Sequence, residues 1–571
     1  MGETRPAGVP YARRRFLFGA AMAMSAPSLL RAGAVDPDHA LHRAASAWRR
    51  AVLARKARAP ECVDLYYESA VFAFAAMAAC PDPSSRDAAK AQSLYNDSLG
   101  DCLRAAMRHG AIDPRSRLIV QTPSGARHVP IVHHGFVWSP EDFQRLVDPD
   151  DAPRNPSNSR DHTRAGVGAT QVVERKNPHA RIDDAFLPDV SYFPATAVLR
   201  PDLDAWLGGV DGGPGDVLEF HDPLRVRSVP LAGVRRRLAG DIDSPISFLE
   251  ESTGGRESGW AGLVNPSQEI HRAFLGMLEP FQPGKIPIVF VHGLYDTPYT
   301  FTDLMNGLRA KPGFLDRYQI LGFRYPTGIT FLHSAALFRG ALHRFEATLD
   351  PSQSDPGVQN TVLIGHSMGG LLSKFQVVSS GEAFYDLALS RPLASLVTSE
   401  ASRAFLANLF YFDPVPFVRR AIFVATPHDG SALVTQPVGR IGDSLIQQPE
   451  DLRPLIAQLE RDNPGAVRRY MHDLPSSIAM LRRRDPTLRT LRSRATSPDL
   501  TIHTLAGTAG LPLVIARGDG VVPIPSALHG GAESQTLVPE IHTTINSSEY
   551  TLVEVDRILR RHAATTETAA R

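Results

Sequence analysis

From Pro283 to the C-terminus, apolar runs alternate with segments of helical character, and this alternation limits the fold more than any other feature. The run Ile286–Val291 contains no polar side chain. A strand that is apolar at every position must be covered on both faces, which is typical of a parallel sheet. Strands alternating with helices therefore predict an α/β domain, with a mostly parallel central sheet and helices on both faces. Further candidate strands are Tyr318–Phe323, Thr361–Ile364, Arg420–Ala425, Leu500–Leu505 and Gln535–Val538.

The chain of 571 residues is too long for one compact core, so several units are expected. Residues 35–110 are rich in Ala, Leu and Arg and predict a helical N-terminal region. Residues 111–283 have short β-like runs between Pro, Gly and Asp clusters and predict a β-rich accessory region. Residues 284–571 form the α/β unit. Two insertions in it, about 377–415 and 432–497, are expected to be caps.

The first residues have the pattern of an export signal. Arg13-Arg14-Arg15-Phe16-Leu17 fits a twin-arginine motif, and an apolar stretch follows it as far as Leu30. Ala32-Gly33-Ala34 offers a cleavage site, so we assign residues 1–34 to a signal and expect a periplasmic protein. An uncleaved membrane anchor is the alternative. After Leu30 we expect no stretch long and apolar enough to cross a bilayer.

The charge balance and the cysteines exclude some classes of function. The formal net charge is +1, which argues against a nucleic-acid-binding protein. The three cysteines, Cys62, Cys80 and Cys102, form no CxxC pair, so a zinc or redox site on them is not expected. The sequence leaves two states of these cysteines possible: one disulfide with an odd thiol, or three free thiols.

The segment from Gly365 to Gly369 carries the chemistry. It reads G-x-S-x-G, with Ser367 at its centre, after the strand Thr361–Ile364 and before a helical run. In such a turn a serine hydroxyl protrudes from a strained backbone, and bulky residues two positions away on either side would clash. The context therefore predicts Ser367 as a nucleophile.

A serine nucleophile needs a base, and the chain order for this fold is Ser, then Asp or Glu, then His. Asp519, in a Gly-Asp-Gly loop, is the expected acid, and Asp429 is the second choice. His542 lies between the last strand and the final helix, where catalytic groups collect in open sheets, and is the expected base. The competing histidines are His503, inside a strand, and His529, before the last strand.

The tetrahedral intermediate needs backbone donors for its oxyanion. We expect one to be the amide of Met368, the residue after the nucleophile. The other should be the amide of Leu294, in a loop that Gly293 allows to approach closely. For His292 we favour a hydrogen-bonding role that braces this loop.

Four segments resemble the lipase and acyltransferase branch of the α/β-hydrolase superfamily. The Gly-Asp-Gly segment resembles the acid loop of lecithin–cholesterol-acyltransferase-like enzymes, which again places the acid at Asp519. Residues 278–287, with Tyr325-Pro326-Thr327-Gly328, look like large exported bacterial α/β hydrolases of unassigned substrate. The four segments are Val291-His292-Gly293-Leu294, Gly365-His366-Ser367-Met368-Gly369-Gly370, Thr426-Pro427-His428-Asp429-Gly430-Ser431 and Gly518-Asp519-Gly520-Val521-Val522-Pro523.

The resemblance, which covers roughly residues 278–560, implies ester substrates, no metal and no organic cofactor. We expect a serine hydrolase that cleaves carboxylic esters, with a small-molecule or lipid ester as substrate. Acyl transfer on the same triad, a non-catalytic lipid-binding protein and a peptidase are the alternatives. Peripheral contact with a membrane and the oligomeric state stay open.

Overall fold

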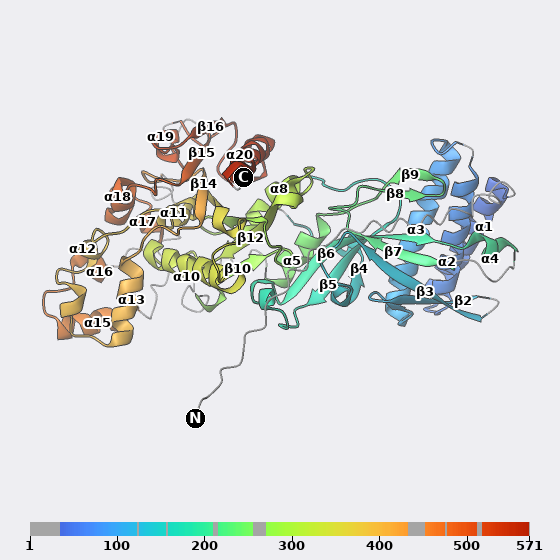
Figure 1. Cartoon of the computed structure of the whole chain (residues 1–571), viewed down its shortest axis with the longest axis horizontal. Coiled ribbons are helices and arrows are strands. Elements are labelled where there is room, and N and C mark those ends of the chain that lie inside the picture. The colour runs from blue at the N-terminus through green and yellow to red at the C-terminus, as the bar shows by residue number, and fades with distance from the viewer. Residues whose placement is uncertain are drawn as a thin grey trace, which may run out of the picture.

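The computed structural model describes residues 35–569 except for 81, 123–124, 156–157, 209–214, 255–269, 432–451, 474–476 and 511–516. The predicted export signal, residues 1–34, lies outside the described residues. Figure 1 shows an elongated molecule: three long helices form one end, a first sheet lies beside them, a second sheet follows, and short helices form the other end.

The N-terminal helices are α1 (Pro37–Lys56), α2 (Cys62–Ala79) and α3 (Arg86–His109), which confirms the predicted helical region. Local signals fix their ends. The Ser85 side chain accepts a hydrogen bond from the Ala88 amide at the start of α3, and Gly110 ends that helix with a left-handed φ of 68°. Cys62, Cys80 and Cys102 are all free thiols.

Helix α2 corrects the expectation that no segment after Leu30 is long and apolar enough to span a bilayer. It has an 18-residue window with a mean hydropathy of 1.3, which suffices by length and composition. However, 72% of that window is buried inside the fold, where α2 packs against α1 and α3. A core helix of a large protein can have this composition, because it is covered on nearly all sides.

The first sheet has the strand order β1-β2-β3-β7-β6-β5-β4 and is antiparallel except where β3 and β7 pair. A hairpin joins β2 to β3, with Thr122 paired to Gly125; residues 123–124 between them lie outside the described residues. The strands are β1 (Ile112–Asp113), β2 (Arg117–Thr122), β3 (Gly125–His134), β4 (Arg145–Val147), β5 (Ala169–Lys176), β6 (Val190–Arg200) and β7 (Val217–His221). A separate hairpin pairs β8 (Ser228–Leu231) with β9 (Val234–Arg237).

The second sheet has the order β10-β12-β11-β13-β14-β15-β16. It is parallel except for β10, which pairs antiparallel with β12 at one edge. The predicted parallel sheet is confirmed, whereas β10 was not anticipated, because its four residues carry no alternation of their own. The strands are β10 (Phe274–Met277), β11 (Ile286–Val291), β12 (Tyr318–Arg324), β13 (Thr361–His366), β14 (Val418–Val424), β15 (Thr501–Gly507) and β16 (Ser534–Val538).

Helices cover both faces of this sheet, as its apolar strands require. On β11, Ile288 and Phe290 belong to the apolar cluster of α8 (Thr302–Arg309) and α20 (Glu549–Ala569). Val289 and Val291 belong to the cluster of α10 (Phe331–Leu349) and α11 (Met368–Phe375). Successive side chains of a strand point to opposite faces, so one apolar run builds both cores. The remaining helices outside the insertions are α4 (Leu203–Gly208), α5 (Ser244–Ser252), α9 (Phe314–Arg317) and α19 (Ile524–Ala527).

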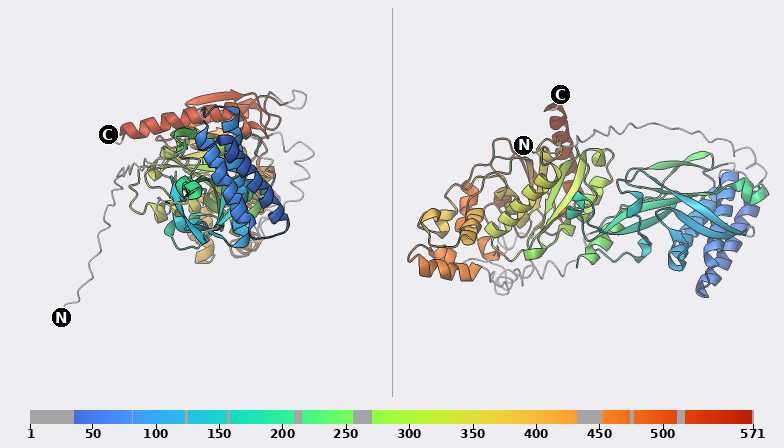
Figure 2. Two further views of the ribbon diagram at one scale, coloured as in Figure 1. Left: turned by 90° about the vertical axis from the view of Figure 1, so that its right-hand side faces the viewer. Right: turned by 60° about the horizontal axis from the view of Figure 1, so that its bottom comes forward.

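Short helices occupy both predicted insertions and gather at one end of the molecule (Figures 1 and 2). In the second insertion one short helix ends at Met480, and the next begins after the cap Asp485. Residues 432–451, at the start of the second insertion, lie outside the described residues. The helices are α12 (Tyr385–Ala388), α13 (Glu400–Phe410), α15 (Leu452–Asp462), α16 (Arg469–Asp473), α17 (Ser477–Met480) and α18 (Pro486–Ser493).

A cluster of charged side chains joins the two sheets. Arg225, after β7, donates to Glu279 at 2.6 Å and to Asp222 at 2.6 Å. Glu279 follows β10, which is an edge strand of the second sheet. Burial raises the pKa of Glu279, but Arg225 outweighs it and holds that pKa below its ordinary value. One guanidinium therefore pairs with two carboxylates at the junction.

We predict that Arg225→Ala lowers the free energy of unfolding by about 3 kcal/mol, because two buried carboxylates lose their cation. Arg227→Ala is the matched control: this exposed arginine also crosses the junction, to the Ala310 carbonyl at 3.0 Å, and its loss should cost about 1 kcal/mol or less. Urea denaturation followed by tryptophan fluorescence measures both. Equal losses would contradict the assigned role of Arg225.

Candidate active site

Ser367 stands at the turn between β13 and α11, at the carboxyl end of the second sheet. Its φ is 53° and its ψ is −122°, a conformation that side chains other than glycine rarely adopt. The Ser367 amide donates to the Val424 carbonyl at 2.9 Å, which fastens the turn to the neighbouring strand. The strained turn predicted from the motif is present.

Three glycines permit this turn, because their missing Cβ atoms would meet backbone or side-chain atoms. A Cβ on Gly369 would lie 2.1 Å from the Val291 carbonyl oxygen, and one on Gly370 would lie 1.8 Å from Thr426 Oγ1. A Cβ on Gly365 would lie 2.5 Å from the Cα of Gly370. Contacts this short require the backbone to move. These contacts explain the clash that we expected for larger residues at Gly365 and Gly369.

The structure brings Ser367, His542 and Asp519 into one hydrogen-bonded line. Ser367 Oγ lies 3.0 Å from Nε2 of His542, and Nδ1 of His542 lies 2.7 Å from Oδ2 of Asp519. Because a carboxylate can only accept, Nδ1 carries the proton and Nε2 is free to accept from the serine. All three side chains are largely buried: 7% of Ser367 and 2% of Asp519 are exposed. This geometry allows a proton to pass from serine to imidazole.

The loop that carries Asp519 holds its carboxylate in place. Oδ1 accepts hydrogen bonds from the amides of Val521 at 2.9 Å and Val522 at 2.7 Å, which leaves Oδ2 for His542. The Asp519 carbonyl also accepts from the His542 amide at 3.0 Å. These backbone donors fix the direction of the carboxylate toward the imidazole.

The competing residues have other partners. Asp429 accepts from Arg483 Nε at 3.0 Å and from Arg492, so its carboxylate serves an ion-pair cluster. His503 is fully buried in β15 and its Nδ1 lies 2.7 Å from Ser534 Oγ. His529 packs beside His428, with ring centroids 5.2 Å apart.

Of the two residues expected to donate to an oxyanion, Met368 follows Ser367 directly, and Leu294 follows Gly293 in a neighbouring loop. Met368 is the first residue of α11, and the amides of a first helical turn have no partner within the helix. A Cβ on Gly293 would lie 3.1 Å from the Cβ of Ser367, so the loop before Leu294 passes directly beside the serine. The Ser367 amide itself is engaged by Val424.

His292 braces this loop, as its neighbours indicate. Its ring stacks on Tyr325 with centroids 4.4 Å apart, and its Nδ1 donates to the Gly293 carbonyl at 2.9 Å. The Tyr325 hydroxyl donates to the His292 carbonyl at 2.8 Å. Burial lowers the pKa of His292 to about 3, so the ring is neutral near pH 7.

Sequence reasoning missed His366. Its ring lies against His542 with centroids 4.8 Å apart, and its Nε2 donates to the His542 carbonyl at 3.2 Å. Burial holds its pKa well below the ordinary value. The neutral ring thus holds the backbone of His542 through its carbonyl. Its place next to Ser367 in the motif was the only signal, and it does not specify a partner.

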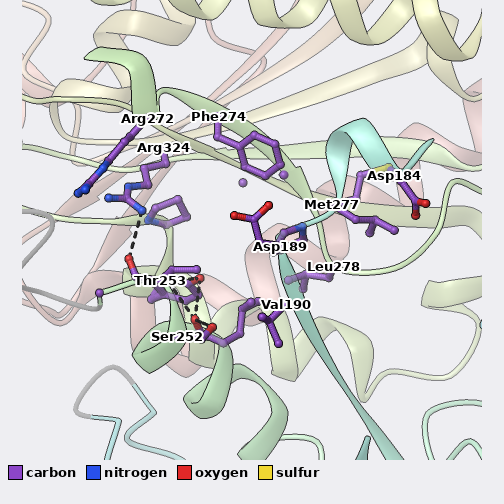
Figure 3. Close-up of a pocket in the computed structure, with 18 of the residues that line it drawn as sticks. Asp184, Asp189, Val190, Ser252, Thr253, Arg272, Phe274, Met277, Leu278 and Arg324 are labelled. Atoms are coloured by element: carbon purple, nitrogen blue, oxygen red, sulfur yellow. Dashed lines mark hydrogen bonds between the residues drawn. The ribbon is translucent and has the colours of Figure 1, made fainter. Parts of the chain in front are cut away.

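A cavity of about 800 Å³ lies at the junction of the two sheets, and its lining includes none of these residues. Phe274, Met277 and Leu278 line it from the region of β10 (Figure 3). Arg324, at the end of β12, donates to the Thr253 carbonyl at 3.2 Å beside it. This cavity is separate from Ser367 and carries no part of the proposed chemistry below.

Residues 288–548 match the model of a family described as the alpha/beta hydrolase family. The mature lipase BlEst2 of Bacillus licheniformis is 17% identical, with a TM-score of 0.31, over 50% of this chain and 98% of that chain. The lipase-esterase related protein of Clostridium acetobutylicum ATCC 824 is 12% identical, with a TM-score of 0.26, over 51% and 99%. The Vlm2 thioesterase domain is 15% identical, with a TM-score of 0.24, over 51% and 97%. No curated protein sequence matches the chain.

We predict that Gly369→Ala lowers the free energy of unfolding by about 3 kcal/mol, because its methyl group would overlap two backbone carbonyls. Gly340→Ala is the matched control: Gly340 lies in α10, where an added methyl group would meet nothing within 4 Å, so alanine should stabilise the helix by up to about 1 kcal/mol. Chemical denaturation of the two variants measures the contrast. A neutral Gly369→Ala would contradict the packing argument.

Proposed function

We propose that this chain, whose residues 288–548 form an α/β-hydrolase domain, is a serine hydrolase that cleaves carboxylic esters through an acyl-enzyme. The observation that carries the proposal is the hydrogen-bonded line from Ser367 through His542 to Asp519, at 3.0 and 2.7 Å. The strained turn supports it, because it presents the Ser367 hydroxyl at the carboxyl edge of the sheet, where ligands bind in open α/β folds.

In the first step, His542 Nε2 takes the Ser367 proton while Oγ attacks the ester carbonyl carbon. Asp519 stabilises the imidazolium that forms and holds its orientation. The tetrahedral intermediate collapses, the bond to the alcohol oxygen breaks, and the imidazolium gives its proton to the departing alcohol. A water molecule then attacks the acyl-enzyme by the same sequence, which releases the acid and restores Ser367.

The negative charge of the intermediate falls on the former carbonyl oxygen. We assign its stabilisation to the amides of Met368 and Leu294, since the Ser367 amide is engaged elsewhere. The N-terminus of α11 adds a favourable dipole at the same place. A donor of this kind contributes about 3 kcal/mol to catalysis in serine hydrolases.

Ser367→Ala should abolish labelling by a fluorophosphonate probe and hydrolysis of p-nitrophenyl esters, with the circular dichroism spectrum unchanged. Asp519→Asn should lower kcat about 10⁴-fold, because the carboxylate sets the tautomer of His542. Asp429→Asn is the matched control and should retain most of the activity. Retention of full activity by Ser367→Ala would overturn the proposal, and a larger loss at Asp429 than at Asp519 would overturn the choice of acid.

The acyl group needs a place beside Ser367, and we infer that it enters a cavity of about 470 Å³ between α10 and α13. Phe323, Phe405 and Leu409 contribute to its lining. In the sheet, Phe323 pairs with Val291, and Val291 pairs with Gly365. Two strand spacings of about 4.8 Å therefore separate the backbone of Phe323 from that of Gly365, which lies two residues before Ser367.

If the acyl chain fills this cavity, kcat/KM should rise from acetate to at least hexanoate or octanoate. Each buried CH₂ should add about fourfold until the space is full. Phe405→Arg should flatten the series, and Val397→Arg, at a position 63% exposed in the same insertion, should not. A p-nitrophenyl ester chain-length series measures this. A flat series for the unaltered protein would indicate a small or open pocket and a carboxylesterase.

A further inference from the structure

The first sheet carries a cluster of three side chains that the proposed reaction does not use. His134 ends β3, and Glu219 and His221 lie in β7. The two strands pair in parallel with His134 opposite His221 and Val132 opposite Glu219. Residues two apart on a strand share a face, so the three side chains project from the same face of the sheet.

Their donor atoms converge. Nε2 of His221 lies 2.9 Å from one Glu219 oxygen, and Nε2 of His134 lies 3.8 Å from the other. The two imidazole rings stack with centroids 4.8 Å apart and planes 18° apart. One ligand atom from each residue lies within 4.8 Å of the other two. Small rotations of the side chains would bring these atoms to the spacing of a coordination sphere.

The hydrogen bonds within the cluster leave one buried atom without a partner. His221 is 6% exposed, and its Nδ1 accepts no hydrogen bond from the part of the chain that the structure describes. An unpaired polar nitrogen inside a protein costs about 1–3 kcal/mol. A cation bound at Nδ1 would use this lone pair, whereas a cation bound at Nε2 would replace the hydrogen bond to Glu219.

The surroundings fit a site with one open position. The side chain of His134 is 42% exposed, which gives solvent and ions a route to the cluster. Arg200, on β6, places Nε 2.7 Å from one oxygen of Glu219. This contact orients the carboxylate, as outer hydrogen bonds do for metal-ligating carboxylates, while the second oxygen faces Nε2 of His221. The positive charge of Arg200 also opposes a bound cation, so neutral imidazoles must supply most of the affinity.

We propose that His134, Glu219 and His221 form a binding site for a divalent transition-metal ion of the zinc class. Two imidazoles and one carboxylate, with a fourth position open to water, are a common ligand set for Zn²⁺. Oxygen-seeking cations such as Ca²⁺ and Mg²⁺ prefer sites built mainly from carboxylates and carbonyls, and this cluster offers a single carboxylate. The bound ion would tie β3 to β7, the one parallel contact of the first sheet. The proposal is independent of the proposed esterase activity.

The test uses the full chain without a polyhistidine tag, stripped with EDTA and titrated with ZnCl₂ by calorimetry. One equivalent should bind, and the melting temperature should rise with zinc concentration. His221→Ala and His134→Ala should each weaken binding by about 100-fold or more. His128→Ala, an exposed histidine on the same strand β3, is the matched control and should bind as the unaltered protein does.

Cobalt titration of the unaltered protein adds a readout that does not depend on the variants folding. A visible absorption band of four-coordinate Co²⁺ with nitrogen and oxygen ligands should appear and should disappear on addition of zinc. The absence of saturable zinc binding to the unaltered, folded protein would overturn the proposal. So would equal affinity in His221→Ala and the unaltered protein, since the ion would then be held elsewhere on the surface.

Discussion

The turn at Ser367 depends on backbone packed against backbone. The first turn of α11 lies so close to the end of β11 that Gly369 has no room for a Cβ beside the Val291 carbonyl. A residue with the dihedral angles of Ser367 costs about 1–3 kcal/mol, and this persists only where the surroundings determine it. Here the parallel pairing of β11, β13 and β14 does so, because Val424 on the neighbouring strand accepts the Ser367 amide. The turn thereby fixes the backbone from which the Ser367 hydroxyl projects.

The site is assembled from loops at one edge of the sheet. Asp519 follows β15 and His542 follows β16, so their side chains reach Ser367 only because three parallel strands end together. Hydrogen bonds from Val521 and Val522 aim the carboxylate. His366 and Tyr325 act one step further out: the first holds the backbone of His542 and the second holds the loop of His292. Rigid support of this kind keeps distances within the range that proton transfer requires.

The N-terminal part is joined to the domain of the second sheet through polar contacts. Besides the Arg225 cluster, Asp303 of α8 accepts from the hydroxyl and amide of Ser159, and Asp243 accepts from Asn306 at 2.9 Å. Buried ionic contacts specify one arrangement of two surfaces more than they stabilise it, since misplaced charges would lose their partners. The proposed metal site lies within the first sheet itself. It would stabilise that sheet without a contribution from the junction.

Residues with strong local patterns could be read without a structure. The apolar run Ile286–Val291 predicted a buried parallel strand with the bounds that the structure has. The strand–turn–helix context singled out Ser367, and chain order singled out Asp519 and His542, which the structure brings together. Strand β10 was not predicted, because four residues carry too few side chains for a periodic signal.

The sequence by itself determined the class of the fold and the candidates for its chemistry, because hydrophobic periodicity and glycine spacing act over a few residues. Only the tertiary structure decided which candidates meet. It paired Asp519, not Asp429, with His542, and it packed the ring of His366 against that histidine. It also set His134 beside His221, 87 positions later in the chain (221 − 134), through the register of β3 on β7. Such contacts arise from the pairing of distant strands, and no local pattern of residues encodes the partner of a strand.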